Sequence, residues 1–443
     1  MQVMKWSVIA LAVAAGTTQM AVASSQSESK GFVEDSSFNI FNRALYMNRD
    51  FRNGATYEST ANEAKGERKG YREDFGLGVR MLFESGFTQG TVGVGFDAHT
   101  LSSFKLDTGD GRQGNGLFAE NELGEAEDTQ TEVGGAIKFR VSDTVLKYGN
   151  QVTASPVFST DDSRILPEVA TGTMLTSNEI EGLELTAGRF TALSDQVQTA
   201  RDSTALKEIN IVGASYSFTD NFSGSIHASD AEDLWKKYYA NLNYNLPLAE
   251  EQALNFDFNI YKSDYEKSYI KSATANEDTG FEGVNESQDN NIWSLAAAYS
   301  IGAHTFTLAH QRSSGDRGYD YGADGDGTIY LSNSVQYSDF NAEDEKSWQA
   351  RYDVDMTSYG VPGLSFMTRY ITGTDINVRE DGLLVDSNAK EHELNIEAKY
   401  VIQEGAAKDL SFRVRNAIYR ANSSYGRDIN DFRLIVEYPL SVL

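Results

Sequence analysis

Two alternating segments near the C-terminus carry arginines on the face opposite their apolar residues. Arg413 and Arg415 stand two apart in 410-LSFRVRNAI-418, and Arg433 occupies a similar place in 432-FRLIVEYPLSVL-443. Side chains two apart on a strand point the same way. A guanidinium is a planar fork of N–H donors that can bind a carboxylate through two parallel hydrogen bonds. The spacing therefore predicts successive binding positions for a carboxylate along one face of a sheet.

Other basic residues share this parity when each alternating segment is examined in turn. If the apolar face of each segment meets lipid, the opposite face lines a lumen, and the basic residues predicted to face inward are Arg80, Lys138, Arg140, Lys147, Lys237, Arg351, Arg369, Lys399, Arg413, Arg415 and Arg433. A charge on the lipid face costs roughly 2–4 kcal/mol at mid-membrane, so energetics alone favour the lumen. A purely structural interpretation is that these cations only pair with the inward acids Asp257, Asp353, Glu393, Glu397 and Glu437.

Residue patterns for catalysis, cofactors and metals are weak. The five histidines (His99, His227, His304, His310 and His392) lie on different segments, without an H-E-x-x-H motif or a nucleophile elbow. There is no Gly-rich phosphate loop and no cysteine. The aspartates at 316, 320, 324 and 326 lie among Tyr319, Tyr321 and Tyr330, and facing the basic residues they would hold a zwitterion by both ends. A solvated loop tip or a weak cation site is the alternative, and Val335 replaces the acidic twelfth position of an EF-hand. We therefore expect neither an enzyme nor a cofactor.

The elements that must position the arginines are short alternating segments. Period-2 alternation over several residues is typical of β-strands. With the weaker candidates at 36–49, 144–149, 174–178 and 183–190, the pattern predicts about eighteen strands. The stronger segments are 73–85, 91–100, 133–141, 212–218, 222–228, 238–246, 254–261, 293–299, 305–311, 348–356, 364–371, 392–400, 410–418 and 432–443.

Short turns alternate with long polar loops, as on the two sides of an outer-membrane barrel. The long loops are predicted at 50–72, 102–131, 150–173, 191–208, 262–290, 312–346 and 373–391. Loop 150–173 holds two prolines and apolar residues (Val157, Phe158, Ile165 and Leu166), which predicts that it folds into the lumen. The expected fold is all-β: one antiparallel transmembrane barrel with inward-folded loops. A soluble β-sandwich is the alternative, but it gives no reason for aromatic-rich outer faces on almost every strand.

The N-terminus and overall charge indicate export. Residues 1–23 resemble a cleaved signal peptide, with Lys5, an apolar run and an A-x-A site ending at Ala23. Residues 24–443 would then form the barrel, although the mean hydropathy of −0.44 would suggest a soluble chain. The net charge of −27 argues against nucleic-acid binding. We expect the outer membrane of a Gram-negative cell, in contact with its lipid and lipopolysaccharide.

Long strings resemble the OprD-type substrate-specific porins of pseudomonads. They include ESGFTQGTVGVGFDA at 84–98, SRILPEVATG at 163–172, WSLAAAYSIGAHTFTLA at 293–309, SYGVPGLSFMTRYITG at 358–373 and FRLIVEYPLSVL at the end. The resemblance implies an 18-stranded barrel that functions as a monomer, with loose trimers as an alternative. It also implies a narrow constriction, where a basic ladder faces an electronegative pocket and small carboxylate-bearing nutrients diffuse through.

The resemblance assigns the ladder to Arg413, Arg415 and Arg433, followed by Arg369, Arg351, Lys138 and Arg140. It places the constriction on loops 150–173 and 312–331, at Ser163, Arg164 and Asp320. One branch of the family prefers basic amino acids and their analogues, including carbapenems, and another prefers anionic cyclic carboxylates. The strings here are more similar to the first branch, so basic amino acids or small peptides are the expected substrates. A channel for anionic or aromatic carboxylates, a weakly selective porin and a barrel hydrolase are the alternatives.

Overall fold

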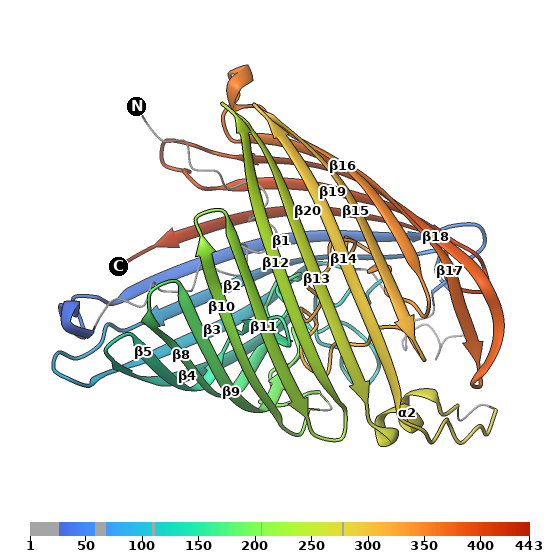
Figure 1. Ribbon diagram of the computed structural model, residues 1–443, viewed down its shortest axis with the longest axis horizontal. Coiled ribbons are helices and arrows are strands. Elements are labelled where there is room, and N and C mark those ends of the chain that lie inside the picture. Colours follow the sequence, from blue (N-terminus) through green and yellow to red (C-terminus); the bar gives the residue numbers. More distant parts are fainter. Residues whose placement is uncertain (1–25, 58–67, 109–110, 205, 277–278) are drawn as a thin grey trace.

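The computed structural model describes residues 26–57, 68–108, 111–204, 206–276 and 279–443, so the expected signal peptide lies outside the described residues. Eighteen strands form one antiparallel sheet that closes on itself, because β1 pairs with β2 on one side and with β20 on the other (Figure 1). In the described part of the chain, no helix is long and apolar enough to cross a membrane. The predicted all-β barrel is confirmed.

Every strand segment predicted from the alternation lies within, or overlaps, one strand of the ring. The strands of the ring are β1 (Ser37–Phe51), β2 (Tyr71–Glu84), β3 (Gly93–Asp107), β4 (Thr129–Val141), β5 (Thr144–Gln151), β8 (Val169–Ile180), β9 (Leu183–Ser194), β10 (Ile209–Thr219), β11 (Phe222–Ala231), β12 (Trp235–Ala249), β13 (Gln252–Tyr265), β14 (Gln288–Ile301), β15 (His304–Gly315), β16 (Lys346–Asp355), β17 (Leu364–Glu380), β18 (Leu383–Val401), β19 (Ser411–Ala421) and β20 (Ile429–Ser441). Outside the ring lie the two-stranded β6 (Ala154–Ser155) and β7 (Phe158–Ser159), the helix α2 (Lys267–Thr274), and the 3-10 turns Gln26–Glu28 and Thr357–Tyr359.

Alternation produces two different faces on each strand. On β4, Val133, Ile137 and Phe139 are exposed on the outer surface, whereas Gln130 and Glu132 are buried inside. Closing the ring pairs the edge strands, so no backbone N–H or C=O row is left open to lipid. Lipid can then cover the apolar outer face without leaving polar backbone unsatisfied.

The predicted loop at 373–391 is wrong. β17 continues to Glu380 and β18 begins at Leu383, so only Asp381 and Gly382 form the turn, both with positive φ. The register shifts three times between Gly373 and Arg379. This polar hairpin therefore extends the sheet at its long-loop end. Its sequence resembles that of a loop because apolar residues do not alternate strictly with polar ones along it.

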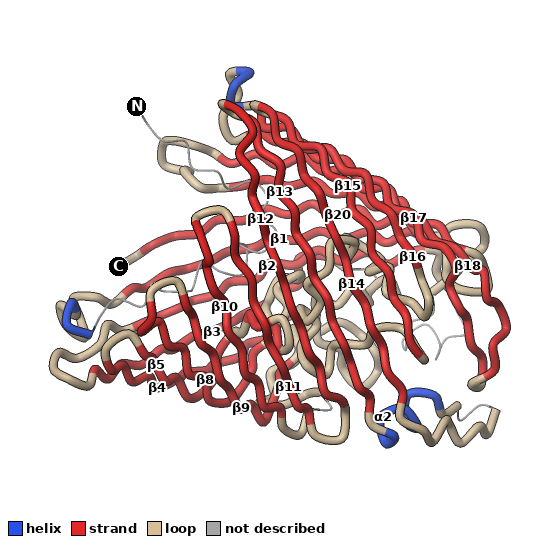
Figure 2. The backbone as a smooth tube through the Cα atoms, viewed as in Figure 1, coloured by secondary structure: helices blue, strands red, loops and turns tan. Residues whose placement is uncertain are grey.

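Two long connections fold inside the ring, where Figure 2 shows loop segments among the strands. Loop 152–168 carries β6 and β7, and its Val157, Phe158, Ile165 and Leu166 are all 2% exposed or less. It is hydrogen-bonded to loop 316–345, since the Ser159 N–H donates to the Thr328 hydroxyl over 2.9 Å and the Gly327 N–H to the Ser159 carbonyl over 3.1 Å. The prediction that the first loop enters the lumen is confirmed.

Candidate functional site

Arg413 and Arg415 lie on the inner face of β19 and share one carboxylate. Arg413 donates two hydrogen bonds to Glu397 on β18, over 2.7 and 2.8 Å, and Arg415 Nε lies 3.0 Å from the same carboxylate. Strand register places Glu397 directly opposite Arg415. The two guanidinium groups thus lie side by side and share one carboxylate. One-to-one pairing would give each of them a carboxylate of its own.

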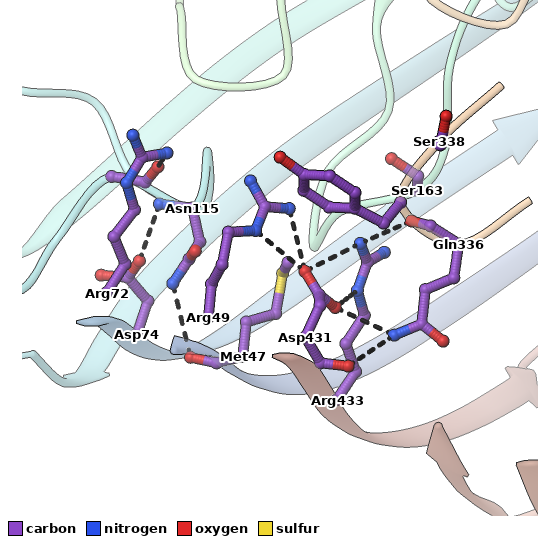
Figure 3. Close-up of polar contacts among 12 residues, drawn as sticks. Met47, Arg49, Arg72, Asp74, Asn115, Ser163, Gln336, Ser338, Asp431 and Arg433 are labelled. Atoms are coloured by element: carbon purple, nitrogen blue, oxygen red, sulfur yellow. Dashed lines mark hydrogen bonds and ion pairs between the residues drawn. The ribbon is translucent and has the colours of Figure 1, made fainter. Parts of the chain in front are cut away.

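The same arrangement repeats on the neighbouring strands. Arg433 on β20 stands opposite Arg415 in the register and bonds Asp431 over 2.7 Å. Arg49 of β1 bonds the other oxygen of Asp431 over 2.9 Å, so the two guanidiniums converge on one carboxylate (Figure 3). We call Arg413, Arg415, Arg433 and Arg49 the arginine row.

The arginine row keeps a net positive charge. Its four guanidiniums share two carboxylates, those of Glu397 and Asp431. Side-chain exposure falls from 34% at Arg413 to 18% at Arg415 and 6% at Arg433, while Arg49 is 15% exposed. The row runs from the end of β1 that leads into a long loop to the short-turn end of β19, so it follows the channel wall.

Arg351 and Arg369 extend the basic surface onto β16 and β17, where they are register partners. Arg351 is paired with Asp353, two residues away, through two bonds of 2.7 Å. Arg369 donates to the Asn395 side-chain oxygen over 2.7 Å and has no ion pair within the described residues. Arg369 thus adds a cation without a bonded carboxylate, although the side chain is largely buried.

Lys138 and Arg140 lie apart from the arginine row, near the short-turn end of β4. Lys138 and Lys147 both contact Asp97 over 2.6 Å. Arg140 donates to the Gln26 side chain over 2.8 Å and lies above the Phe87 ring. These cations anchor the segment near Gln26 and the turn between β2 and β3, so they form a second basic cluster.

The tip of loop 152–168 meets the basic surface through Asp162 and Arg164. Asp162 accepts bonds from Arg43 of β1 and contacts Arg80 of β2. Burial alone would raise the pKa of Asp162, but the two arginines outweigh this effect and lower it. The backbone carbonyl of Arg164 also accepts from Arg43, over 2.6 Å. The loop is therefore fastened to the wall by cations.

The Arg164 side chain lies between positive and negative groups. Its Nε donates to the Asn115 carbonyl over 2.8 Å and its Nη1 to the Ser163 hydroxyl over 2.7 Å. Burial lowers the pKa of Arg164 to about 10; Arg433 and Arg49 act in the same direction, whereas Asp161 and Asp431 oppose them. Ser163 itself is exposed. We call this region, where the loop tip and the arginine row meet, the constriction.

Loop 316–345 also contacts the arginine row and its shared carboxylate Asp431. Its Gln336 donates to Asp431 over 2.9 Å, and Arg433 donates to the Gln336 carbonyl over 3.0 Å (Figure 3). The Tyr337 and Ser338 N–H groups donate to Glu393 over 3.1 and 2.9 Å. These contacts hold the polar segment 336–338 beside the arginine row.

The expected role of the aspartates in this loop needs correction. Asp324 is fully buried and pairs with Lys237 over 2.6 Å, with Trp235 Nε1 donating over 3.0 Å. Asp320 pairs with Arg317 and accepts from the Tyr269 hydroxyl. No three His, Cys, Asp or Glu side chains in the described part of the chain are grouped to hold a metal ion. Asp324 is thus a structural anchor and not part of a solvated loop tip, because it is buried in an ion pair with Lys237.

Residues 30–442 match the model of a family described as outer membrane porin, OprD family. The chain belongs to the OprD family of outer-membrane porins. It is 46% identical to Porin D of Pseudomonas aeruginosa, with both chains covered in full. The crystal structure of OccAB1 from Acinetobacter baumannii superposes with a TM-score of 0.87 at 36% identity, covering 95% of this chain and 100% of that one. The structure of Pseudomonas aeruginosa OpdK with vanillate gives 0.79 at 29% identity, covering 93% and 100%.

Membership makes this protein a channel of the outer membrane and not an enzyme. The long loops of this porin mark the extracellular side and the short turns the periplasmic side. Within this channel, the purely structural interpretation holds in part: Asp353, Glu397 and Glu437 pair with arginines, Glu437 with Arg43 over 2.8 Å. Glu393 instead holds loop 316–345, and Asp257 bonds asparagines.

The alternation missed Arg43 and Arg49 on β1. Leu45 and Met47 lie between them on the same inward face and are fully buried against the inner loops. An apolar inner face conceals the usual polarity signal of a barrel strand. Arg43 and Arg49 are six residues apart, so they point to the same face of β1. In the pairing of β1 with β20, that face is also the face of Arg433. This even spacing is the signal that could have revealed them.

Proposed function

We propose that this porin selectively passes small solutes bearing a carboxylate, with basic amino acids or small peptides preferred. The observation that carries the proposal is the arginine row: four guanidiniums with two shared carboxylates, leading to the constriction. A substrate carboxylate can replace or supplement the shared carboxylates as it moves from one fork to the next. Each position binds weakly because an internal acid competes, and weak successive sites allow conduction.

The preference for a cationic partner group rests on the acids around the row. The chain carries 65 acidic against 38 basic residues. Asp161 and the exposed Asp326 belong to the inner loops that form the constriction. An acidic mouth raises the local concentration of cationic solutes. A zwitterion with a distal cation can therefore satisfy both the arginine row and the loop acids.

A channel for aromatic carboxylates is the second candidate. It is favoured by the similarity to OpdK, whose crystal structure holds vanillate. Uptake of L-arginine and benzoate into proteoliposomes tests the two. We expect arginine to enter faster; faster benzoate uptake would select the aromatic branch, and a barrel silent to both solutes and ions would contradict the channel mechanism. We further propose that one barrel is the functional unit.

A further inference from the structure

Six inward side chains of β12 and β13 form a compact set of amides around one acid. Strand register places Asn241, Asn243 and Asn245 of β12 opposite Asn259, Asp257 and Asn255 of β13. We call these six residues the amide block. Its members are half-buried, except for Asn259, which is 6% exposed.

Asp257 is held by neutral donors alone. Asn241 and Asn243 each donate to its Oδ1 over 3.0 Å, and Asn259 donates to Oδ2. No cation lies within ion-pair distance of Asp257 among the residues that the structure describes, whereas Glu397 and Asp431 each contact two arginines of the arginine row. Amide donors orient a carboxylate without neutralising it. On the lumen wall, Asp257 is therefore bonded by amides and by no cation of the described chain.

In strand order the amide block lies well apart from the arginine row. β12 and β13 are the tenth and eleventh strands of the eighteen-strand ring, six to nine places from β19, β20 and β1, which carry the row. The block also sits toward the periplasmic side, because Asn255 is close to the start of β13 at Gln252. A solute that has passed the constriction would meet it next.

Most amide oxygens of the block accept hydrogen bonds from neighbouring side chains. Asn259 Oδ1 accepts from the Tyr239 hydroxyl over 2.6 Å and from Asn241 over 2.9 Å, and Asn243 Oδ1 accepts from Asn255 over 3.0 Å. In the described part of the chain, the side-chain oxygens of Asn241 and Asn245 accept no hydrogen bond. These two oxygens are therefore available as further acceptors for an ammonium or guanidinium in the lumen.

We propose that the amide block is a cation-accepting site of the periplasmic half of the lumen, centred on Asp257. It receives a cationic group, either the ammonium or guanidinium of a solute or a monovalent metal ion. The site adds a position for the cationic group to the proposed function. It rests on that function only in the assumption that solutes pass through the lumen. In this arrangement the arginine row guides the carboxylate, while the amide block offers the opposite charge its own position.

The test is planar-bilayer recording of the full chain carrying Asp257→Asn, which removes the charge but keeps the shape. In a KCl gradient we expect the ratio of cation to anion permeability to fall about twofold. Agmatine added on the periplasmic side should need a higher concentration to block the current by half. A changed ion ratio with unchanged agmatine block assigns the site to metal cations, and a change in both assigns it to organic cations as well.

The matched control is Glu250→Gln, which removes the same charge from the exposed turn between β12 and β13. Asp257→Glu keeps the charge and should retain the ion ratio. The proposal is overturned if Asp257→Asn changes neither quantity, or if Glu250→Gln changes them equally. Faster uptake of arginine than of benzoate should persist in Asp257→Asn, so a failure of this site is distinguishable from a failure of the proposed function.

Discussion

The arginine row and the Lys237–Asp324 pair show two uses of charge inside one barrel. In the row, two cations contact each carboxylate and the side chains are 6–34% exposed. Lys237 and Asp324 form a one-to-one pair, with both side chains 0% exposed and the ammonium 4.6 Å from the ring centres of Trp235 and Tyr319. The first arrangement leaves positive charge available to solutes. In the second, each charge neutralises the other, and the pair fastens loop 316–345 to β12.

The number of cations per carboxylate and the burial of the pair therefore distinguish a functional ion pair from an anchoring one better than residue type does. A buried pair is sensitive to the loss of one partner, because the remaining charge is uncompensated. A partly exposed cation that shares its acid, such as Arg413 at 34% exposure, can lose that acid and still be solvated. Variants on the two sides should therefore differ in which property changes.

The largest effect is expected at the anchor. Lys237→Met leaves Asp324 without its cation and should lower the unfolding free energy by about 3–5 kcal/mol. Heat-dependent gel mobility of the detergent-purified barrel measures this loss, and bilayer recordings should show added noise from the released loop. The control Lys237→Met/Asp324→Leu removes both charges and should recover most of the stability. A stable, quiet single variant would show that the loop is held elsewhere.

A second effect concerns the shared carboxylate of the row. Glu397→Gln removes the acid between Arg413 and Arg415, so anion selectivity should rise while stability falls by about 1.5–3 kcal/mol. Reversal potentials in a KCl gradient measure the selectivity. Glu250→Gln, which removes a charge from an exposed turn, should leave both properties near wild type. A shift toward cations would contradict the assignment of the row to anion passage.

A pH effect is expected from Glu168, at the end of loop 152–168. Burial raises the pKa of Glu168 to about 9, although the Asp161 and Asp326 N–H groups oppose this rise. Between the ordinary pKa and 9 the folded state binds a proton that the unfolded state has lost, so this group makes stability fall as pH rises. Glu168→Gln should therefore flatten the decline in melting temperature between pH 5 and pH 9. An unchanged slope would mean that Glu168 is ionised in the folded barrel.

The smallest effect is expected at Lys346, whose bond of 3.0 Å to Asp375 joins two side chains that are 43% and 47% exposed. Surface ion pairs contribute about 0–1 kcal/mol. Lys346→Gln should leave the melting temperature, the ion ratio and arginine uptake almost unchanged. A large loss of stability here would weaken the contrast between exposed and buried pairs.

Strand alternation was sufficient to predict the ring, because a lipid-facing side and a lumen-facing side impose period 2 on nearly every strand. It failed where one face stops being distinctive. The inward Leu45 and Met47 conceal Arg43 and Arg49, and the polar hairpin around Asp381 reads as a loop. Contacts between distant segments, such as Lys237 with Asp324, leave no local pattern and needed the structure.

The most direct test compares uptake of L-arginine with that of agmatine, the same cation without its carboxylate, in proteoliposomes. If the arginine row guides carboxylates, the wild-type porin should pass arginine faster than agmatine. Arg413→Gln/Arg415→Gln should abolish that preference while leaving the barrel folded. Equal uptake of the two solutes by the wild type, or an unchanged preference in the double variant, would contradict the role of the row.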